Sequence, residues 1–566
     1  MNTTDVNTNV YRLRIQPEEG RCTVDVQGVD SSVFESTSPF LLAPEFVSGD
    51  QQYEVPRIVT ERHLPRGEQE LVLRSDIVGE VSGWVENHLY CLRDRIVCTA
   101  RYLVDADHHV SHWHVLGEGS RLGMAGVHAY IGESEKYLDG RELSAENLDV
   151  STSSHNFKHW NVCPRLVFMD GNVLATVGGT EIAHDYGLEL KTDDGRGVEH
   201  MRFNYGGEAA PHPGEAGQVH RGPRLQVKFT FGSSPLRAQK IFTRDMIDDG
   251  IVPPQKYRPE QLPWRRPWYC TWADQVLLSQ NFDGDADWKG KRPANGILDQ
   301  ELVLRAARRI DEWDLNVGTI VMDAGWQDRR GDWNLDTDRF PDIRGMVDEI
   351  HGLGFKFHMW WAPLQVEKGA QVLEREGFTY ELDEIDEYAL NYTNPELRRY
   401  VAEKVDRWFS SGPGGWDIDG LKLDWLCERI QPVENAIDPD WRGEERALYK
   451  MQRMFCDIAS RHKDAFLIKS QPRNPHLANL SPVTGISENF SDDLSHLTRS
   501  LPSLKAWMPG WWLKAHCVYQ PGQVAEHVRL MRGMDPDGIP EIGIVLPENM
   551  PDEKMPELRE ALKSSS

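Results

Sequence analysis

Two groups of carboxylates follow short apolar runs and could perform acid and base chemistry. In the run from 420 to 425, Lys422 and Asp424 are two residues apart, so in a strand they would share one face. Asp492 and Asp493 follow a second such run. An ionised carboxylate that faces a protonatable one is the arrangement used to hydrolyse glycosidic bonds. We therefore treat the two groups as a candidate pair and expect Lys422 to keep Asp424 ionised.

Other apolar runs end in polar or aromatic side chains that could contact a substrate. Asp323 follows Val321-Met322, and Gln471 follows Lys469-Ser470. Tryptophans near the same ends would offer flat apolar faces to sugar rings. These are Trp272, Trp326, Trp360, Trp361 and Trp425.

The runs that carry these residues alternate with segments of helical periodicity from about residue 268 onward, which predicts a (β/α)8 TIM barrel. In such a barrel the catalytic groups lie at the C-terminal ends of the strands. The eight strand candidates are 269–273, 318–324, 355–362, 420–425, 465–470, 485–489, 506–513 and 541–546. The helix candidates include 300–313, 344–353, 395–409 and 444–461.

The first part of the chain has a different pattern and reads as strands. Residues 11–15, 22–26 and 225–231 alternate apolar and polar side chains, which is typical of half-buried strands. The Gly- and Pro-rich stretch 206–223 predicts an exposed loop. We expect an N-terminal antiparallel β-sandwich domain. The predicted domains are the sandwich at 1–255, a linker at 256–267 and a catalytic barrel at 268–566 with little or no C-terminal β-domain.

Several motifs of the predicted barrel resemble glycoside hydrolase clan D, and most closely glycoside hydrolase family 36, the melibiase-type α-galactosidases. Asp323-Ala324-Gly325-Trp326, Gly331-Asp332-Trp333, Arg339-Phe340-Pro341 and Gly354-Phe355-Lys356-Phe357 occur in the order of that family's second and third strands. The resemblance covers roughly residues 265–500. It implies a retaining α-glycoside hydrolase that acts on a terminal sugar.

The same resemblance assigns roles to individual residues. Lys422-Leu423-Asp424 is similar to the Lys-x-Asp nucleophile strand, so Asp424 would form the covalent glycosyl-enzyme. Ser491-Asp492-Asp493 resembles the segment that carries the acid/base, which would be Asp492, with Asp493 as the competing residue. The predicted substrate-binding residues are Asp323, Trp326, Lys422, Trp361, Trp272, Trp425, Gln471 and Asp493.

Two departures from the family 36 pattern affect the predicted sugar. Ala324 stands where the family has a second Asp that binds galactose, and Ala362 stands where it has a Glu. The strand around Lys422 and Asp424 is also similar to that of glycoside hydrolase family 31. An α-glucosidase or α-xylosidase of that type, or a non-catalytic sugar-binding barrel, is therefore the alternative to an α-galactosidase-like enzyme.

Composition limits the partners and the compartment. The chain has 566 residues and a formal net charge of −26 at pH 7, which disfavours nucleic acid and anionic membranes as partners. No apolar run has the length of a membrane span. The eight cysteines lack CxxC spacing, which favours a reduced, cytoplasmic protein. We expect a carbohydrate substrate and no metal or cofactor; monomer and homo-oligomer both stay open.

Overall fold

The computed structural model divides the chain into two compact units. The first contains residues 1–252, 443–446 and 506–509, and the second contains 253–442, 447–505 and 510–566. The described residues are 3–29, 32–38, 41–46, 51–105, 110–115, 120–123, 128–132, 140–143, 150–153, 165–180, 186–192, 197–205, 216–254, 263–279, 294–382, 387–426, 436–441, 444–469, 474–485 and 494–563. No helix within these ranges is both long and apolar enough to cross a bilayer.

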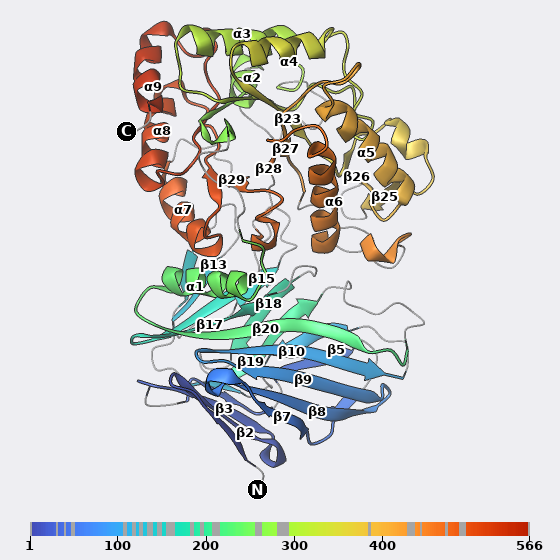
Figure 1. Ribbon diagram of the computed structural model, residues 1–566, viewed down its shortest axis with the longest axis vertical. Helices are drawn as coiled ribbons and strands as arrows, with labels where there is room; N and C mark the ends of the chain where they lie inside the picture. Colours follow the sequence, from blue (N-terminus) through green and yellow to red (C-terminus); the bar gives the residue numbers. More distant parts are fainter. Residues whose placement is uncertain are drawn as a thin grey trace. The chain divides into compact units, whose positions relative to one another are not determined.

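The first unit is built from antiparallel sheets, in one of which β8 (Gln69–Gly79), β9 (Gly83–Cys91) and β10 (Arg95–Val104) run side by side (Figure 1). The largest sheet has the order β14 (Gly140–Leu143), β13 (His128–Gly132), β16 (Arg165–Asp170), β17 (Val173–Gly179), β20 (His220–Phe231), β10 (Arg95–Val104), β9 (Gly83–Cys91), β8 (Gln69–Gly79) and β6 (Gln51–Tyr53), and β7 (Arg57–His63) also pairs with β8. A second sheet has the order β15 (Val150–Ser153), β18 (Tyr186–Thr192), β19 (Val198–Tyr205), β11 (Val110–Val115) and β5 (Leu42–Phe46). A third has the order β1 (Thr4–Asn7), β2 (Tyr11–Gln16), β3 (Arg21–Val26), β4 (Phe34–Ser36) and β12 (Arg121–Leu122).

The apolar positions of these strands form the core of the first unit, as their alternation predicts. In β2 the side chains of Tyr11, Leu13 and Ile15 are buried and those between them are half-buried. This period of two places one face of the strand against the core.

Two predictions for the first unit need correction. Residues 235–248, read as part of an all-strand segment, form helix α1 (Pro235–Asp248). The signal was present, because Ser234 caps the helix by accepting from the Arg237 N–H, and Pro235 takes the first turn. The predicted loop 206–223 also extends too far, since β20 begins at His220; residues 206–215 lie outside the described ranges.

The second unit contains the predicted parallel barrel. Six of its strands form a continuous parallel sheet in the order β28, β27, β23, β22, β21, β31, and two further strands, β29 and β30, pair in parallel. Ile539, just before β31, bridges to Lys514 of β30. The strands are β21 (Trp268–Cys270), β22 (Thr319–Met322), β23 (Lys356–Trp361), β27 (Gly420–Leu423), β28 (Leu467–Lys469), β29 (Val483–Gly485), β30 (Trp512–Lys514) and β31 (Glu541–Ile542). This topology confirms the predicted fold class.

Helices surround the barrel strands (Figure 1). They are α2 (Trp272–Ser279), α3 (Gln300–Glu312), α4 (Ile343–Gly352), α5 (Pro395–Phe409), α6 (Glu444–Ala459), α7 (Ser495–Trp507), α8 (Val524–Met534) and α9 (Met555–Leu562). A small sheet of β24 (Gln365–Val366), β26 (Glu387–Leu390) and β25 (Thr379–Leu382) follows β23. The helices predicted at 300–313, 344–353, 395–409 and 444–461 are confirmed to within two residues at each end.

The predicted seventh strand, 506–513, is displaced. Ala506 and Trp507 are apolar because they form the buried end of α7, and Pro509-Gly510 separates this helix from β30. The strand itself begins only at Trp512. The sixth strand starts two residues earlier than predicted, at Val483, and residues 486–489 lie outside the described ranges.

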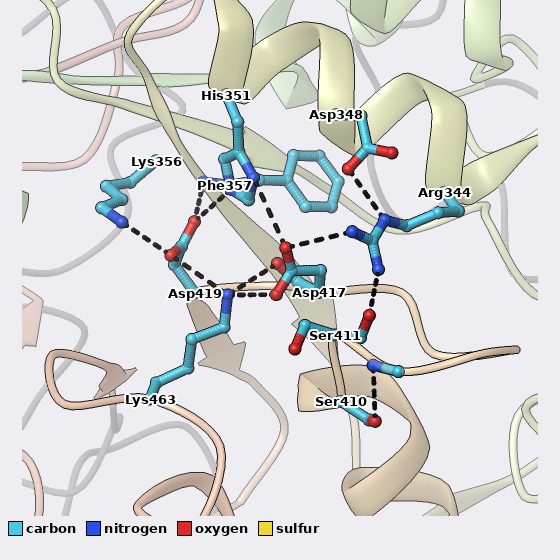
Figure 2. A network of polar contacts seen from close by, with 11 residues as sticks. Arg344, Asp348, His351, Lys356, Phe357, Ser410, Ser411, Asp417, Asp419 and Lys463 are labelled. Atoms are coloured by element: carbon cyan, nitrogen blue, oxygen red, sulfur yellow. Dashed lines mark hydrogen bonds and ion pairs between the residues drawn. The ribbon is translucent and has the colours of Figure 1, made fainter.

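A network of ion pairs joins β23, β27 and their neighbouring helices at the N-terminal ends of the strands (Figure 2). Asp419, just before β27, accepts from His351 Nε2 at 2.7 Å, from Lys356 Nζ at 2.9 Å and from the Phe357 backbone N–H at 3.0 Å. Lys463 pairs with the neighbouring Asp417. In a (β/α)8 barrel this end serves stability, while the other end carries the chemistry.

We predict that Asp419 makes the barrel acid-sensitive. Burial by itself would raise the pKa of Asp419, but hydrogen bonds from His351, the Phe357 N–H and Lys356 lower it well below its usual range. A carboxylate whose folded-state pKa is lowered stabilises the fold above its unfolded pKa of about 3.9, and this contribution disappears as the pH falls below that value.

Urea unfolding of wild type and Asp419→Asn at several pH values tests this expectation. At pH 7 the substitution should lower the free energy of unfolding by roughly 1.5–3 kcal/mol, the range for hydrogen bonds to a charged group, and the difference should shrink below pH 4. The exposed Asp338 gives a control, Asp338→Asn. A gap that is constant from pH 7 to pH 3 would contradict the role of Asp419.

Candidate active site at the C-terminal ends of the barrel strands

Asp424 directly follows β27 and is held from two sides. Its backbone N–H donates to the Trp361 carbonyl at 2.9 Å, and its Oδ2 accepts from the Trp360 indole N–H at 2.8 Å. The next residue, Trp425, has a φ of 54°, in the left-handed region, which costs a residue with a side chain free energy. The half-buried Asp424 carboxylate thus lies at the C-terminal end of its barrel strand in a defined orientation.

Apolar side chains form a wall beside this carboxylate. Ala324, Trp360 and Ala362 are buried in one hydrophobic cluster, against which the half-buried Trp272 and Trp425 pack. Trp272 opens α2, after β21. The wall therefore joins the ends of four strands, and it contains both alanines that replace the acidic residues of family 36.

Lys422 forms its ion pair with Asp323, which corrects the predicted pairing of Lys422 with Asp424. Lys422 Nζ lies 2.7 Å from Asp323 Oδ2, and the Cys270 thiol donates to the same oxygen at 3.0 Å. All three side chains are buried. The sequence spacing predicts that Lys422 and Asp424 share a strand face. It does not predict the contact of Lys422 with Asp323, because this contact crosses β23 and depends on the order of the strands in the barrel.

The buried pair keeps both groups charged. Burial by itself would raise the pKa of Asp323, but Lys422 and the Cys270 hydrogen bond lower it below its usual value. Burial would lower the pKa of Lys422, but Asp323 raises it well above the normal value for lysine. An ammonium and a carboxylate in contact away from water stabilise each other's charged forms.

Further charged side chains lie at the same depth in the barrel, and the sequence reasoning did not select them. Lys469 is in register with Lys422 on the neighbouring strand, and Lys514 contacts Glu541 Oε2 at 2.5 Å. All are buried. Burial and the nearby Lys514 and Lys422 lower the pKa of Lys469 to about 7. The available signal was a charged residue inside an apolar run, as in Trp512-Leu513-Lys514.

Two predicted substrate-binding tryptophans lie elsewhere. Trp326 and Trp361 are fully buried. Trp361 packs edge-on against Trp333 and Trp408, at ring distances of 5.1 and 5.0 Å, and Trp326 packs against Trp408 at 5.6 Å. Because neither ring has an exposed face, neither supports the sugar-binding role predicted for it.

The remaining predicted site residues fall into two groups. Asp424, Lys422, Asp323, Trp272 and Trp425 are brought together around the C-terminal ends of β21, β22, β23 and β27. Asp492, Asp493 and Gln471 lie outside the described residues.

Among the described residues, two clusters have the geometry to hold a metal ion. One consists of His516, Cys517 and Glu541 inside the barrel. The other consists of Asp348, His351 and Asp417 near the N-terminal ends of the barrel strands. In each, a lysine already neutralises a carboxylate, Lys514 at Glu541 and Lys463 at Asp417. A dication would have to compete with these ammonium groups, so the charge distribution favours the ion pairs.

Comparison with known proteins relates this barrel to two glycoside hydrolase families. Residues 291–473 match the model of the glycosyl hydrolases family 31 TIM-barrel domain. A curated relative, the A type blood α-D-galactosamine galactosaminidase of Flavonifractor plautii, is 25% identical over 150 residues, which cover 23% of this chain and 14% of that protein. The chain therefore spans only a small part of this relative's length.

Solved structures match the fold over nearly the whole chain. The GH36 α-galactosidase AgaA of Geobacillus stearothermophilus has a TM-score of 0.61 at 12% identity, and the match covers 99% of this chain and 85% of that one. The α-galactosidase of Lactobacillus brevis has a TM-score of 0.61 at 11% identity, with 99% and 82% coverage. Variants of AgaA have been crystallised with raffinose and with stachyose.

Taken together, the matched family model and the shared architecture show that this barrel resembles the barrels of glycoside hydrolase families 31 and 36, and that antiparallel sheets precede it in the chain. These comparisons confirm the predicted resemblance to glycoside hydrolases. The barrel sequence matches family 31, whereas the architecture matches family 36, which agrees with the motif pattern that pointed to both.

Proposed function

We propose that this protein is a retaining α-glycoside hydrolase that acts on a terminal sugar. The observation that carries the proposal is the Asp424 carboxylate, which follows a central barrel strand and is oriented by the Trp360 N–H at 2.8 Å. The half-buried Trp272 and Trp425 beside it offer apolar surface of the kind that packs against sugar rings.

In the proposed mechanism, Asp424 attacks the anomeric carbon while Asp492 gives its proton to the leaving oxygen, and the glycosidic bond breaks. The product of this step is a glycosyl ester on Asp424. Asp492 then removes a proton from water, the water oxygen attacks the anomeric carbon, and the ester bond to Asp424 breaks. Two displacements at one carbon give net retention of the α-configuration.

The substrate class is proposed to be a neutral α-glycoside of the galactoside type. The structural relatives support this choice, because they are α-galactosidases and include complexes with raffinose and stachyose. The family 31 match over 291–473 and the apolar Ala324 and Ala362 favour an α-glucoside or α-xyloside as the second candidate. No disulfide joins the described cysteines, which are all buried, and this agrees with the cytoplasmic location we propose.

A parallel assay of nitrophenyl α-galactoside, α-glucoside, α-xyloside and N-acetyl-α-galactosaminide tests the proposal. We expect turnover of at least one glycoside, with the α-anomer as the first product seen by NMR. Turnover of a glycoside other than the galactoside would favour the second candidate. No turnover of any of them, together with measurable sugar binding, would instead indicate a non-catalytic sugar-binding barrel.

A further inference from the structure

We propose that Trp360 is the positioning residue of Asp424, an inference that rests on the proposed function. Its indole N–H donates to Asp424 Oδ2 at 2.8 Å, and its side chain is only 3% exposed. A buried donor that faces a half-buried carboxylate has little water to compete for its hydrogen bond. Trp360 therefore holds the carboxylate in one orientation while it reacts.

The surroundings of Trp360 fix the indole for this role. The Trp360 carbonyl accepts from the Trp326 indole N–H at 2.8 Å, which anchors the backbone of β23 at this residue. Ala324 and Ala362 pack against the ring in the apolar wall. Side chains this small leave space for a tryptophan, and they place no second carboxylate next to Asp424. The two departures from family 36 thus belong to the same arrangement as the Trp360 hydrogen bond.

The hydrogen bond also has an electrostatic consequence. A donor to the ionised form of a carboxylate favours that form, and a nucleophilic Asp424 must be ionised to attack. Loss of the donor would free the carboxylate to rotate and would remove a hydrogen bond to its ionised form. These two effects predict a slower chemical step and a change in its dependence on pH.

The substitution Trp360→Phe removes the N–H and keeps most of the aromatic packing. We expect kcat to fall roughly 10- to 100-fold, the effect of losing a hydrogen bond to a charged group, with KM changed much less. The acidic limb of the kcat/KM profile should move to higher pH, because the variant lacks the hydrogen-bond donor to the ionised nucleophile. The probe is whichever nitrophenyl glycoside the wild-type protein hydrolyses.

The neighbouring residue supplies the matched control. Trp361 lies on the same strand, and its buried indole nitrogen has no hydrogen-bond partner among the described residues. Trp361→Phe should therefore leave the acidic limb in place, and any loss of activity should follow loss of thermal stability, measured by circular dichroism.

The outcomes separate the inference from the function on which it rests. If the wild-type protein hydrolyses no glycoside, the proposed function fails and the positioning role fails with it. If the wild type is active and Trp360→Phe retains its kcat and its pH profile, only the inference is overturned. Equal losses in both variants without movement of the acidic limb would also overturn it, since packing alone would explain them.

Discussion

Replacing Asp424 with Asn should abolish turnover while leaving the fold intact. We expect a fall in kcat of at least about 10³-fold, because an uncharged amide is a poor nucleophile and cannot form the glycosyl ester. The position tolerates the change structurally, since Asn keeps an oxygen that can accept from Trp360. The assay compares initial rates on the best nitrophenyl glycoside, with the fold checked by circular dichroism.

A control and a rescue experiment make this result specific. Asp338→Asn changes an exposed carboxylate of the same unit and should retain full activity. For Asp424→Gly, azide ion can occupy the vacated space and attack the anomeric carbon directly. A single displacement inverts the centre, so the product should be the β-glycosyl azide. Wild-type rates in Asp424→Asn would refute the assignment of the nucleophile.

The second large effect is expected at the buried Lys422–Asp323 pair. Lys422→Met should lower the free energy of unfolding by about 3–5 kcal/mol, because it leaves Asp323 buried without its cation. Both side chains are almost inaccessible, at 3% and 4% exposure. Urea unfolding followed by tryptophan fluorescence measures the change, and Lys368→Met, at an exposed lysine, should shift the midpoint very little.

A double substitution separates loss of the ion pair from loss of packing. If the unpaired carboxylate is the main cost, Lys422→Met combined with Asp323→Asn should be less destabilising than the sum of the two single changes. Strict additivity would mean that the two charges do not interact. Additivity together with a loss below about 1 kcal/mol for Lys422→Met, the range of an exposed ion pair, would contradict the role of Asp323 as the buried partner of Lys422.

Local signals explain which parts of the fold were predictable. Helices α3 and α5 begin where Asp299 and Asn394 cap their first turns, and Pro395 occupies the first position of α5. Such caps depend only on residues that are close together in the sequence, so the sequence predicts them. The seventh strand was misplaced because the apolar Ala506-Trp507 end of α7 is as hydrophobic as a buried strand, and a short apolar run does not distinguish the two.

Some residues of the candidate site were predictable from the sequence, but their contacts were not. Asp424 was found from its strand and motif, whereas its donor Trp360 lies 64 residues away. Likewise the partner of Lys422 is 99 residues distant. Which side chains meet inside a barrel depends on strand order and register, and these are set by long-range packing. The sugar-binding role predicted for Trp361 lacks support because its ring packs against Trp408 of α5 and Phe455 of α6. The sequence alone does not show these long-range contacts.

The most direct test of the central claim is to trap the glycosyl-enzyme and locate the label. A 5-fluoro-α-glycosyl fluoride of the preferred sugar should react with the wild-type protein and stop before hydrolysis, since fluorine disfavours the second displacement. Digestion and tandem mass spectrometry should then find one fluoroglycosyl group on the peptide that contains Asp424, attached to that carboxylate. A label on any other residue, or steady turnover with inversion and no label, would contradict the account.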